Sequence, residues 1–509
     1  MTKNKKANHH HIEWQPEFCP DIPTAYGPIE YRTYRQRLIE IDRLLLAGIE
    51  TQFVREVCAP LPEDCPAKQL QRMAKNAALA LRSNIARKLH GLGYSAFATR
   101  AADSNLLRWF LRIDALGMKR TPAKSTLERN DKIFSPERMD AFNLRVFAQS
   151  AQEHGARELG LHAPVEFSDM FIDATCLKAN IHFPIDWVLL RDAARTLMKA
   201  VACIRRHGLR NRMPQDPLRF LGEMNKLSMA MSASARKTGT PARRKRILRL
   251  MKKLSGKIEA HARAHLALLA QQRERAGLSE KQAAQIAGRI ERILAQLPAA
   301  IKQAHERIIG GRKIKNSEKI LSLYEEDANV IIRGKAGARV EFGRELLLCE
   351  TRNGMIAHHT LLAPGQDANE AFRKSLETLE SAGLKPQVAW ADRGLGIKAN
   401  KKYLEQKEIK SGLCERNPEE LRERLENEEG YAEGLKRRGA TEARIAIVKN
   451  IFVGNPCLAK GEEHTRVALG WAVLAHNLWV LARQEINKRE EKKKMKEQKD
   501  KKRKRKKTT

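Results

Sequence analysis

Five short apolar segments interrupt a chain that is otherwise mostly patterned as helix, and this arrangement constrains the fold more than any other feature. The segments are 170–172, 330–332, 346–349, 356–362 and 387–390. Each is a mostly apolar stretch of strand length, although 356–362 includes two histidines and a threonine and 387 is a glutamine. We expect them to join in one sheet, with a helical block from about 190 to 310 inserted between the first strand and the rest. Asn353-Gly354 is a typical hairpin turn between the third and fourth segments.

The chain before the first strand is patterned as helix. Between 31 and 152, apolar residues recur at helical spacing, as in the stripe of Leu38, Ile41 and Leu44. This predicts an all-helical domain with a basic surface. Such a domain suits DNA binding, although a purely structural bundle fits the same pattern. The polar, proline-punctuated residues before it predict a loose arm.

The inserted block predicts an antiparallel helical hairpin. Ile247, Met251 and Leu254 begin a seam that steps by alternating four and three residues. Gly277 ends this helix, and Ser279 with Gln282 forms a capping box for the next one. The block is basic, so it could contact DNA, pair two subunits, or do both.

The charge of the chain points to a polyanionic partner. Lys and Arg number 96 against 60 Asp and Glu, which gives a formal net charge of +36. Nucleic acid is the usual partner of such a protein, and an anionic membrane surface is the alternative. Residues 489–509 hold 13 basic and 4 acidic side chains. This low-complexity segment predicts a disordered tail, and most of the excess charge therefore belongs to the folded part.

Cysteine usage and hydropathy indicate a soluble protein of a reducing compartment. The eight cysteines show no C-x-x-C spacing, which argues against a disulfide framework or a zinc site. No apolar segment near the N-terminus has the form of a secretory signal. The apolar stretch 467–482 is too short to span a bilayer and contains His476 and Asn477. We therefore expect a cytoplasmic location.

Two of the predicted strands each deliver an aspartate at or near the carboxyl end. Asp173 stands in the sequence FIDAT, and Asp392 stands in VAWADRG. In open α/β sheets, reactive groups lie beyond the carboxyl ends of strands. An aspartate after a strand also commonly forms a turn or caps a helix, so either residue alone has a structural explanation.

A third acidic residue lies between two cations on a predicted helix. Arg438, Glu442 and Lys449 are spaced by four and then seven residues, which places them on one side of a helix that includes all three. A carboxylate flanked by cations suits a site where the acid holds a metal ion and the cations hold phosphates. An exposed face with salt bridges is the alternative.

Together these residues resemble the DDE transposases of bacterial insertion sequences. The acidic triad of that family would fall on Asp173, Asp392 and Glu442. One branch carries a Y-x2-R-x3-E-x6-K signature, and Arg438, Glu442 and Lys449 match its R, E and K, whereas Leu435 stands at the Tyr position. The runs DATCLKANIHFPID, AHNLW, LLRWFLRID and PAKSTLERN resemble further segments of the family. The resemblance covers most of residues 95–487.

The resemblance implies an α/β fold: an RNase H-like mixed sheet with flanking helices, a large helical insertion and an N-terminal all-helical domain. The expected domains are a loose arm (1–30), a helical DNA-binding domain (31–160), the RNase H-like core (161–190 and 311–487), the helical insertion (191–310) and a basic disordered tail (488–509).

The resemblance also implies an activity, metal-dependent DNA strand cleavage and strand transfer at insertion-sequence ends. Asp173, Asp392 and Glu442 would hold two Mg²⁺ ions, for which Mn²⁺ could substitute. Arg438 and Lys449 would bind DNA phosphates. Asn180 and His182 follow the first aspartate closely and could either touch the site or order a loop.

The implied partner is double-stranded DNA, both the terminal inverted repeats and the target, bound by a homodimer associated with the nucleoid and not with a membrane. Two other functions fit the same sequence. One is a metal-dependent nuclease, or a domesticated relative that no longer transposes. The other is a non-catalytic DNA-binding protein whose acidic residues are structural.

Overall fold

The computed structural model describes residues 21–23, 27–62, 64–113, 120–234, 240–335 and 338–505. The predicted arm, 1–30, lies mostly outside the described residues. The chain forms two compact units, one comprising Met1–Leu177 with Glu345–Thr509 and the other comprising Lys178–Arg344. We call them the sheet unit and the helical unit. None of the described helices is both long and apolar enough to cross a membrane.

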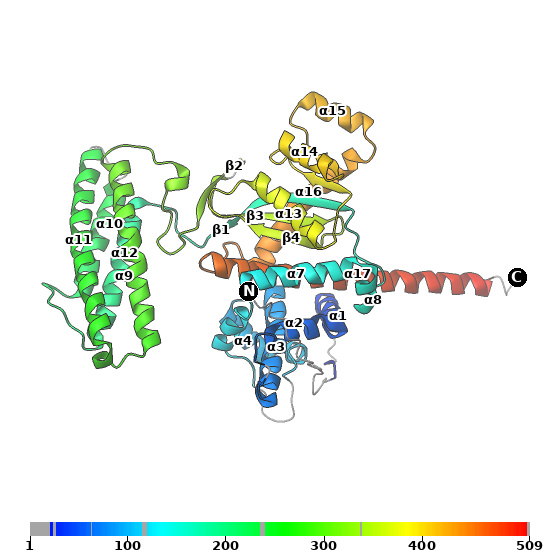
Figure 1. Ribbon diagram of the computed structural model, residues 1–509, viewed down its shortest axis with the longest axis horizontal. Coiled ribbons are helices and arrows are strands. Elements are labelled where there is room, and N and C mark those ends of the chain that lie inside the picture. The colour runs from blue at the N-terminus through cyan, green and yellow to red at the C-terminus, as the bar shows by residue number, and fades with distance from the viewer. Residues whose placement is uncertain are drawn as a thin grey trace, which may run out of the picture. The chain divides into compact units, whose positions relative to one another are not determined.

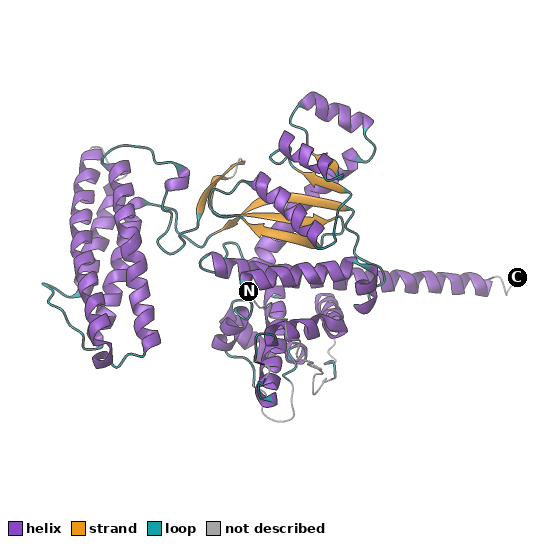
Figure 2. Ribbon diagram, viewed as in Figure 1, coloured by secondary structure: helices purple, strands orange, loops and turns teal. Residues whose placement is uncertain are grey.

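The predicted α/β character is confirmed, since the described residues form one mixed sheet of six strands among many helices (Figure 2). The strands are β1 (Asp169–Lys178), β2 (Asn329–Lys335), β3 (Ala338–Thr351), β4 (Ile356–Leu361), β5 (Val388–Ala391) and β6 (Lys410–Leu413). Their order is β2-β3-β1-β5-β6, and β4 pairs with β3. All five strand segments predicted from the sequence are present, and β6 is an additional one.

Strand direction differs on the two sides of β1. β1 runs parallel to β5, which runs parallel to β6. On the other side, β3 pairs antiparallel with β2 and β4. The predicted turn at Asn353-Gly354 joins β3 and β4, with Gly354 at a φ of 85° that favours glycine.

One strand boundary was predicted wrongly. We expected Asp173 at or near the carboxyl end of its strand, but β1 continues to Lys178. The reason is tertiary, since β1 pairs with β3 as well as with β5, and Thr175, Cys176 and Leu177 are buried in the continuing strand. Asp173 therefore lies in the middle of a strand, whereas Asp392 directly follows β5, as predicted.

Helices cover both faces of the sheet. On one face, Ile172, Leu347 and Ala389 join a large apolar cluster that includes Phe372 of α13 (Ala368–Ser381). On the other face, Leu348 packs against residues of α16, η4 and α17. The remaining elements of this part of the chain are α14 (Lys398–Gln406), α15 (Pro418–Asn427), α16 (Tyr431–Ile447), the π-helical turn η4 (Val448–Val453) and α17 (Glu462–Arg505).

The predicted N-terminal helices are present and share the large apolar cluster with the sheet. They are α1 (Ile29–Leu44), η1 (Leu45–Ile49), α2 (Glu50–Cys58), α3 (Ala67–Leu89), α4 (Tyr94–Asp103), α5 (Asn105–Phe110), α6 (Lys124–Asp131), α7 (Pro136–Ala151) and α8 (Glu153–Glu158). α1, α3 and α7 pack against α17 (Figure 1). The fully buried Arg82 of α3 binds Glu50 through two hydrogen bonds and Asp42 through a third.

Helix α17 ties the helices to the sheet. The buried Asn477, in the AHNLW segment, accepts a hydrogen bond from the backbone N–H of Ile356 (2.9 Å) and donates one to its carbonyl (2.8 Å) at the start of β4. α17 continues to Arg505, so most of the predicted disordered tail, 488–509, is helical here. Lys, Glu and Arg, which dominate the tail, are good helix formers.

The helical unit contains the predicted hairpin. Its long helices are α9 (Asp186–Arg206), α10 (Pro217–Ser234), α11 (Thr240–Gln272) and α12 (Glu280–Ile308), with short 3₁₀ turns η2 (Arg273–Ala276) and η3 (Asn316–Glu318). Figure 1 shows the four long helices side by side, and α9 packs against the other three. Gly277 is left-handed (φ 60°), and the Ser279–Gln282 capping box is formed. The unit extends beyond the predicted range 191–310 on both sides.

Candidate active site

Two neighbouring parallel strands place Asp173 and Asp392 side by side. The β1–β5 register aligns Phe171 with Trp390, and each aspartate stands two residues further along its strand. Neighbouring strands lie about 4.8 Å apart. Phe171 and Trp390 stack with ring centroids 6.0 Å apart on one face of the sheet. Because side chains alternate along a strand, the two aspartates project from that same face.

Helix α16 packs on this face and carries the third acidic residue. Its first residue, Tyr431, joins Phe171 and Trp390 in one buried aromatic cluster. Arg438 and Glu442 lie one turn apart further along the helix, with Arg438 partly buried and Glu442 exposed. The prediction that these two residues share one helix is confirmed.

The pKa of Asp173 shows that the acidic residues influence one another. It is raised from 3.8 to about 6, first by burial and then by the negative charge of Asp392, with a smaller contribution from Glu442. The Arg438 cation opposes these effects and lowers the pKa. The structure thus brings Asp173, Asp392, Glu442 and Arg438 into one electrostatic cluster, with Glu442 the weakest contributor.

Lys449 reaches the same strand from the end of the helix. It lies in η4, the π-helical continuation of α16. Its Nζ is 3.2 Å from the Thr175 hydroxyl oxygen. Thr175 is two residues beyond Asp173 on β1 and therefore points to the same face. The sequence analysis did not single out Thr175, although its position two residues after Asp173 on the same strand indicates that both side chains lie on one face.

Local hydrogen bonds orient both aspartates. One carboxylate oxygen of Asp173 accepts a bond from the backbone N–H of Ala174 (2.8 Å). One oxygen of Asp392 accepts a bond from the backbone N–H of Leu395 (3.2 Å), inside the turn that follows β5. Asp392 thus stabilises a turn, as an aspartate after a strand commonly does, and it also belongs to the acidic cluster.

A buried glutamate that the sequence analysis missed anchors α16. Glu350 of β3 is 1% exposed. Its carboxylate accepts hydrogen bonds from Arg437 (3.0 Å) and from the hydroxyl of Thr441 (2.9 Å), and Arg444 lies 3.5 Å away. Burial raises the pKa of Glu350, whereas its arginine partners lower it. Three α16 side chains thus converge on one strand residue and fix the helix that presents Glu442.

A close approach of α16 to the sheet depends on glycine. A Cβ atom on Gly434 would lie 1.9 Å from the Trp390 ring, which is far inside van der Waals contact. Gly439, on the same helix, has open space where its Cβ atom would be. Gly434 therefore sets how closely α16 packs against the strand that precedes Asp392.

Other residues singled out from the sequence lie outside this cluster. Asn180 and His182 are exposed and belong to the helical unit, not to the unit that holds the carboxylates. Leu435, at the position of the signature tyrosine, packs against the aromatic cluster. Tyr431 does not replace that tyrosine as an exposed group, because it is fully buried and donates a hydrogen bond to the Leu413 carbonyl.

The donor set of the cluster fits a divalent cation. Among the described residues, no three His, Cys, Asp or Glu side chains are arranged as a ready-made metal group. Asp173, Asp392 and Glu442 nevertheless offer only carboxylate oxygens, the ligands that Mg²⁺ and Mn²⁺ prefer. A cation would also stabilise the ionised form of Asp173, whose pKa is raised first by burial and then by repulsion from Asp392.

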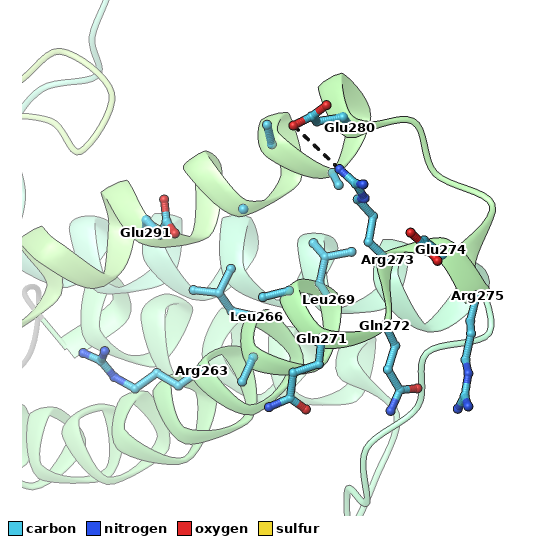
Figure 3. Close-up of a pocket in the computed structure, with 15 residues that line it drawn as sticks. Arg263, Leu266, Leu269, Gln271, Gln272, Arg273, Glu274, Arg275, Glu280 and Glu291 are labelled. Atoms are coloured by element: carbon cyan, nitrogen blue, oxygen red, sulfur yellow. Dashed lines mark ion pairs between the residues drawn. The ribbon is translucent and has the colours of Figure 1, made fainter.

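A cavity elsewhere lacks these features. It lies in the helical unit where α11 meets α12, with a volume of about 1010 Å³ (Figure 3). Leu266 and Leu269 line it, and its rim mixes cations with acids, including the 3.8 Å ion pair between Arg273 and Glu280. This mixed rim does not favour a polyanion.

No protein-family model, curated protein or solved structure matches the chain.

The raised pKa of Asp173 predicts a pH-dependent gain in stability for Asp173→Asn in metal-free buffer. Asp173 ionises near pH 3.8 in the unfolded chain but only near pH 6 in the folded chain. Its ionisation therefore lowers the free energy of unfolding progressively as the pH rises from 3.8 to about 6, and by a constant amount at higher pH. The variant should be more stable by about 2–3 kcal/mol at pH 7.5, with the gain vanishing towards pH 4. Urea unfolding in the presence of EDTA at several pH values measures this difference in the free energy of unfolding.

The control for this measurement is Asp367→Asn. Asp367 is an exposed N-cap of α13 that accepts a bond from the backbone N–H of Asn369, and asparagine caps helices equally well. Equal effects of the two variants at every pH would contradict the electrostatic cluster.

The close approach of α16 predicts that Gly434→Ala destabilises the sheet unit. Alanine normally stabilises a helix relative to glycine by up to about 1 kcal/mol, and Gly439→Ala should do so. The added methyl at Gly434 must instead push α16 away from Trp390, at a cost of about 1–3 kcal/mol. Thermal unfolding of the two variants compares them directly, and a stabilising Gly434→Ala would show that α16 does not pack as described.

Proposed function

We propose that this chain is a DDE-type transposase that cleaves DNA strands and transfers them at the ends of an insertion sequence. The observation that carries the proposal is the electrostatic cluster of Asp173, Asp392 and Glu442, which come from three distant segments. The sequence order and the residue types match the family's acidic triad. Arg438 belongs to the same cluster, and Lys449 contacts the Thr175 hydroxyl on the Asp173 strand.

The sheet supports an RNase H-like core within this proposal. β1 lies between an antiparallel group (β2, β3 and β4) and a parallel pair (β5 and β6). Asp173 stands on β1, and Asp392 follows its parallel neighbour β5. The helix that carries Glu442 packs on the face from which both aspartates project.

Each residue of the cluster has a proposed task. Asp173, Asp392 and Glu442 would hold Mg²⁺ or Mn²⁺. When bound, a pair of such ions activates an oxygen nucleophile and stabilises the leaving oxygen in phosphodiester chemistry. Arg438 and Lys449 bind and orient the DNA phosphates, since a cation next to an acidic cluster offsets its repulsion of the polyanion.

The other implied properties belong to the same proposal. The helices of residues 31–160 would recognise the terminal inverted repeats, and a homodimer would hold two DNA ends together. The protein would work at the nucleoid in the cytoplasm. The net charge of +36 supports a nucleic-acid partner.

The proposal predicts that Asp392→Asn abolishes DNA chemistry but not DNA binding. The change preserves size and removes one ligand charge, so cleavage should fall by orders of magnitude. Binding should persist or tighten, because repulsion between the acid and the phosphates is relieved. The substrate is a supercoiled plasmid that carries the encoding gene with its flanking DNA. Nicking and joining to a second plasmid are scored with Mg²⁺ or Mn²⁺.

Asp367→Asn is again the matched control, because it makes the same chemical change at an exposed helix cap. Metal-dependent cleavage and joining by the wild type and the control, both lost in Asp392→Asn, would support a transposase. Cleavage without joining would favour a nuclease. DNA binding without any metal-dependent product from the wild type would contradict an enzymatic function and leave a DNA-binding protein.

A further inference from the structure

The excess positive charge is concentrated in the helical unit. Residues 178–344 contain 36 Lys and Arg against 14 Asp and Glu, which is a net charge of +22 out of the +36 of the whole chain. The 489–509 tail contributes a further +9. Only +5 therefore remains for the rest of the chain, which includes the candidate active site. The helical unit, which does not contain the three carboxylates, thus carries most of the attraction for polyanions.

Helix α11 collects part of this charge into one exposed stripe. Its residues 243–257 include eight Lys and Arg and no Asp or Glu. Five of these cations are exposed, namely Arg243, Arg246, Arg249, Lys253 and Lys257. At roughly 100° per residue they fall within an arc of about 120°. The opposite side of the helix packs into the unit's core through Leu248, Met251 and Ile258.

The stripe cations differ from two other cations of α11 whose side chains contact neighbouring helices of the same unit. Arg244 lies over the Trp187 ring at 4.9 Å, and Lys252 contacts a ring nitrogen of His305 at 3.1 Å. In contrast, none of the five stripe residues forms an ion pair with a described acidic residue. Unneutralised cations held on a rigid helix keep their full attraction for an external anion.

The dimensions of the stripe suit a DNA backbone. From Arg243 to Lys257 the helix rises about 21 Å at 1.5 Å per residue, which corresponds to about six base pairs of duplex at 3.4 Å each. A membrane surface fits less well. Helices that bind membranes insert an apolar face, whereas the apolar face of α11 is buried, and Leu250 is the single large apolar residue exposed among the stripe cations.

A second group of cations lies elsewhere on the same unit. Arg195, Lys199, Arg206 and Arg289 surround a cavity of about 370 Å³ between α9 and α12. None of the described residues that line this cavity is acidic. Two separate groups of cations on one small unit indicate binding of an extended polyanion better than binding of a single small anion.

We propose that the helical unit, residues 178–344, binds duplex DNA without sequence preference through the exposed cations of α11. This surface is additional to the phosphate-binding role of Arg438 and Lys449. It rests on the proposed function only in taking DNA as the partner, and it requires no catalysis. Phosphate contacts of this kind give affinity and positioning and carry no sequence information.

The test replaces three stripe residues in the full-length protein, as Arg246→Gln with Arg249→Gln and Lys253→Gln. Binding to random-sequence duplex DNA is measured in EDTA over a range of salt concentrations. Loss of three phosphate contacts should make the slope of log K against log salt shallower by about two to three. The affinity at about 0.1 M salt should fall roughly 100-fold.

The matched control removes three lysines with the same change in net charge, as Lys374→Gln with Lys385→Gln and Lys407→Gln. Each of these lysines already pairs with a glutamate on the sheet unit, at 2.7, 3.3 and 2.6 Å. The slope should change little in this variant. Equal slopes for the stripe variant and the control would overturn the proposal, since the loss would then reflect net charge alone.

Two further measurements make the result specific. Circular dichroism and thermal unfolding should be unchanged in the stripe variant, because all three residues are exposed. Binding to vesicles of phosphatidylcholine with phosphatidylserine is the second measurement. A variant that lost vesicle binding but kept DNA binding would overturn the proposal in favour of a membrane surface. Plasmid cleavage is scored separately, so a missing stripe effect with intact metal-dependent cleavage would refute only this inference.

Discussion

The sheet unit holds two mutually repelling carboxylates, Asp173 and Asp392, at neighbouring places on one face of its sheet. Asp173 lies on β1 and Asp392 directly follows the parallel strand β5, and the pKa of Asp173 is raised first by burial and then by the negative charge of Asp392. A sheet that served only for stability would place apolar or oppositely charged residues here. Burial is the larger of the two causes, because it removes the water that would stabilise the ionised carboxylate.

The surroundings hold this unfavourable arrangement in place. The aromatic stack of Phe171, Trp390 and Tyr431 packs α16 onto the face that carries the aspartates. Gly434 allows the helix to approach closely, and Glu350 gathers three α16 side chains onto β3. Structural strain of this type is typical of functional sites, where the fold maintains an arrangement that local energetics disfavour.

Much of the fold could be predicted because its signals are local. The strand segments, the turn at Asn353-Gly354 and the Ser279–Gln282 capping box each depend on neighbouring residues, and the structure contains all of them. The remaining features depend on distant partners. Glu350 is a single acid at the end of an apolar strand, and its arginines lie on a helix much later in the chain. The mid-strand position of Asp173 follows from pairing of β1 with neighbours that the sequence places far away.

If Asp173, Asp392 and Glu442 form one cation site, Mn²⁺ binding depends on each of these carboxylates. Binding is followed by electron paramagnetic resonance at pH 7.5 for the wild type, for Asp173→Asn and Glu442→Gln, and for the control Glu433→Gln, which changes another exposed glutamate on α16. Asp173→Asn and Glu442→Gln should each weaken Mn²⁺ binding at least tenfold, whereas Glu433→Gln should leave it unchanged. Equal Mn²⁺ affinity in all four proteins would contradict the shared site.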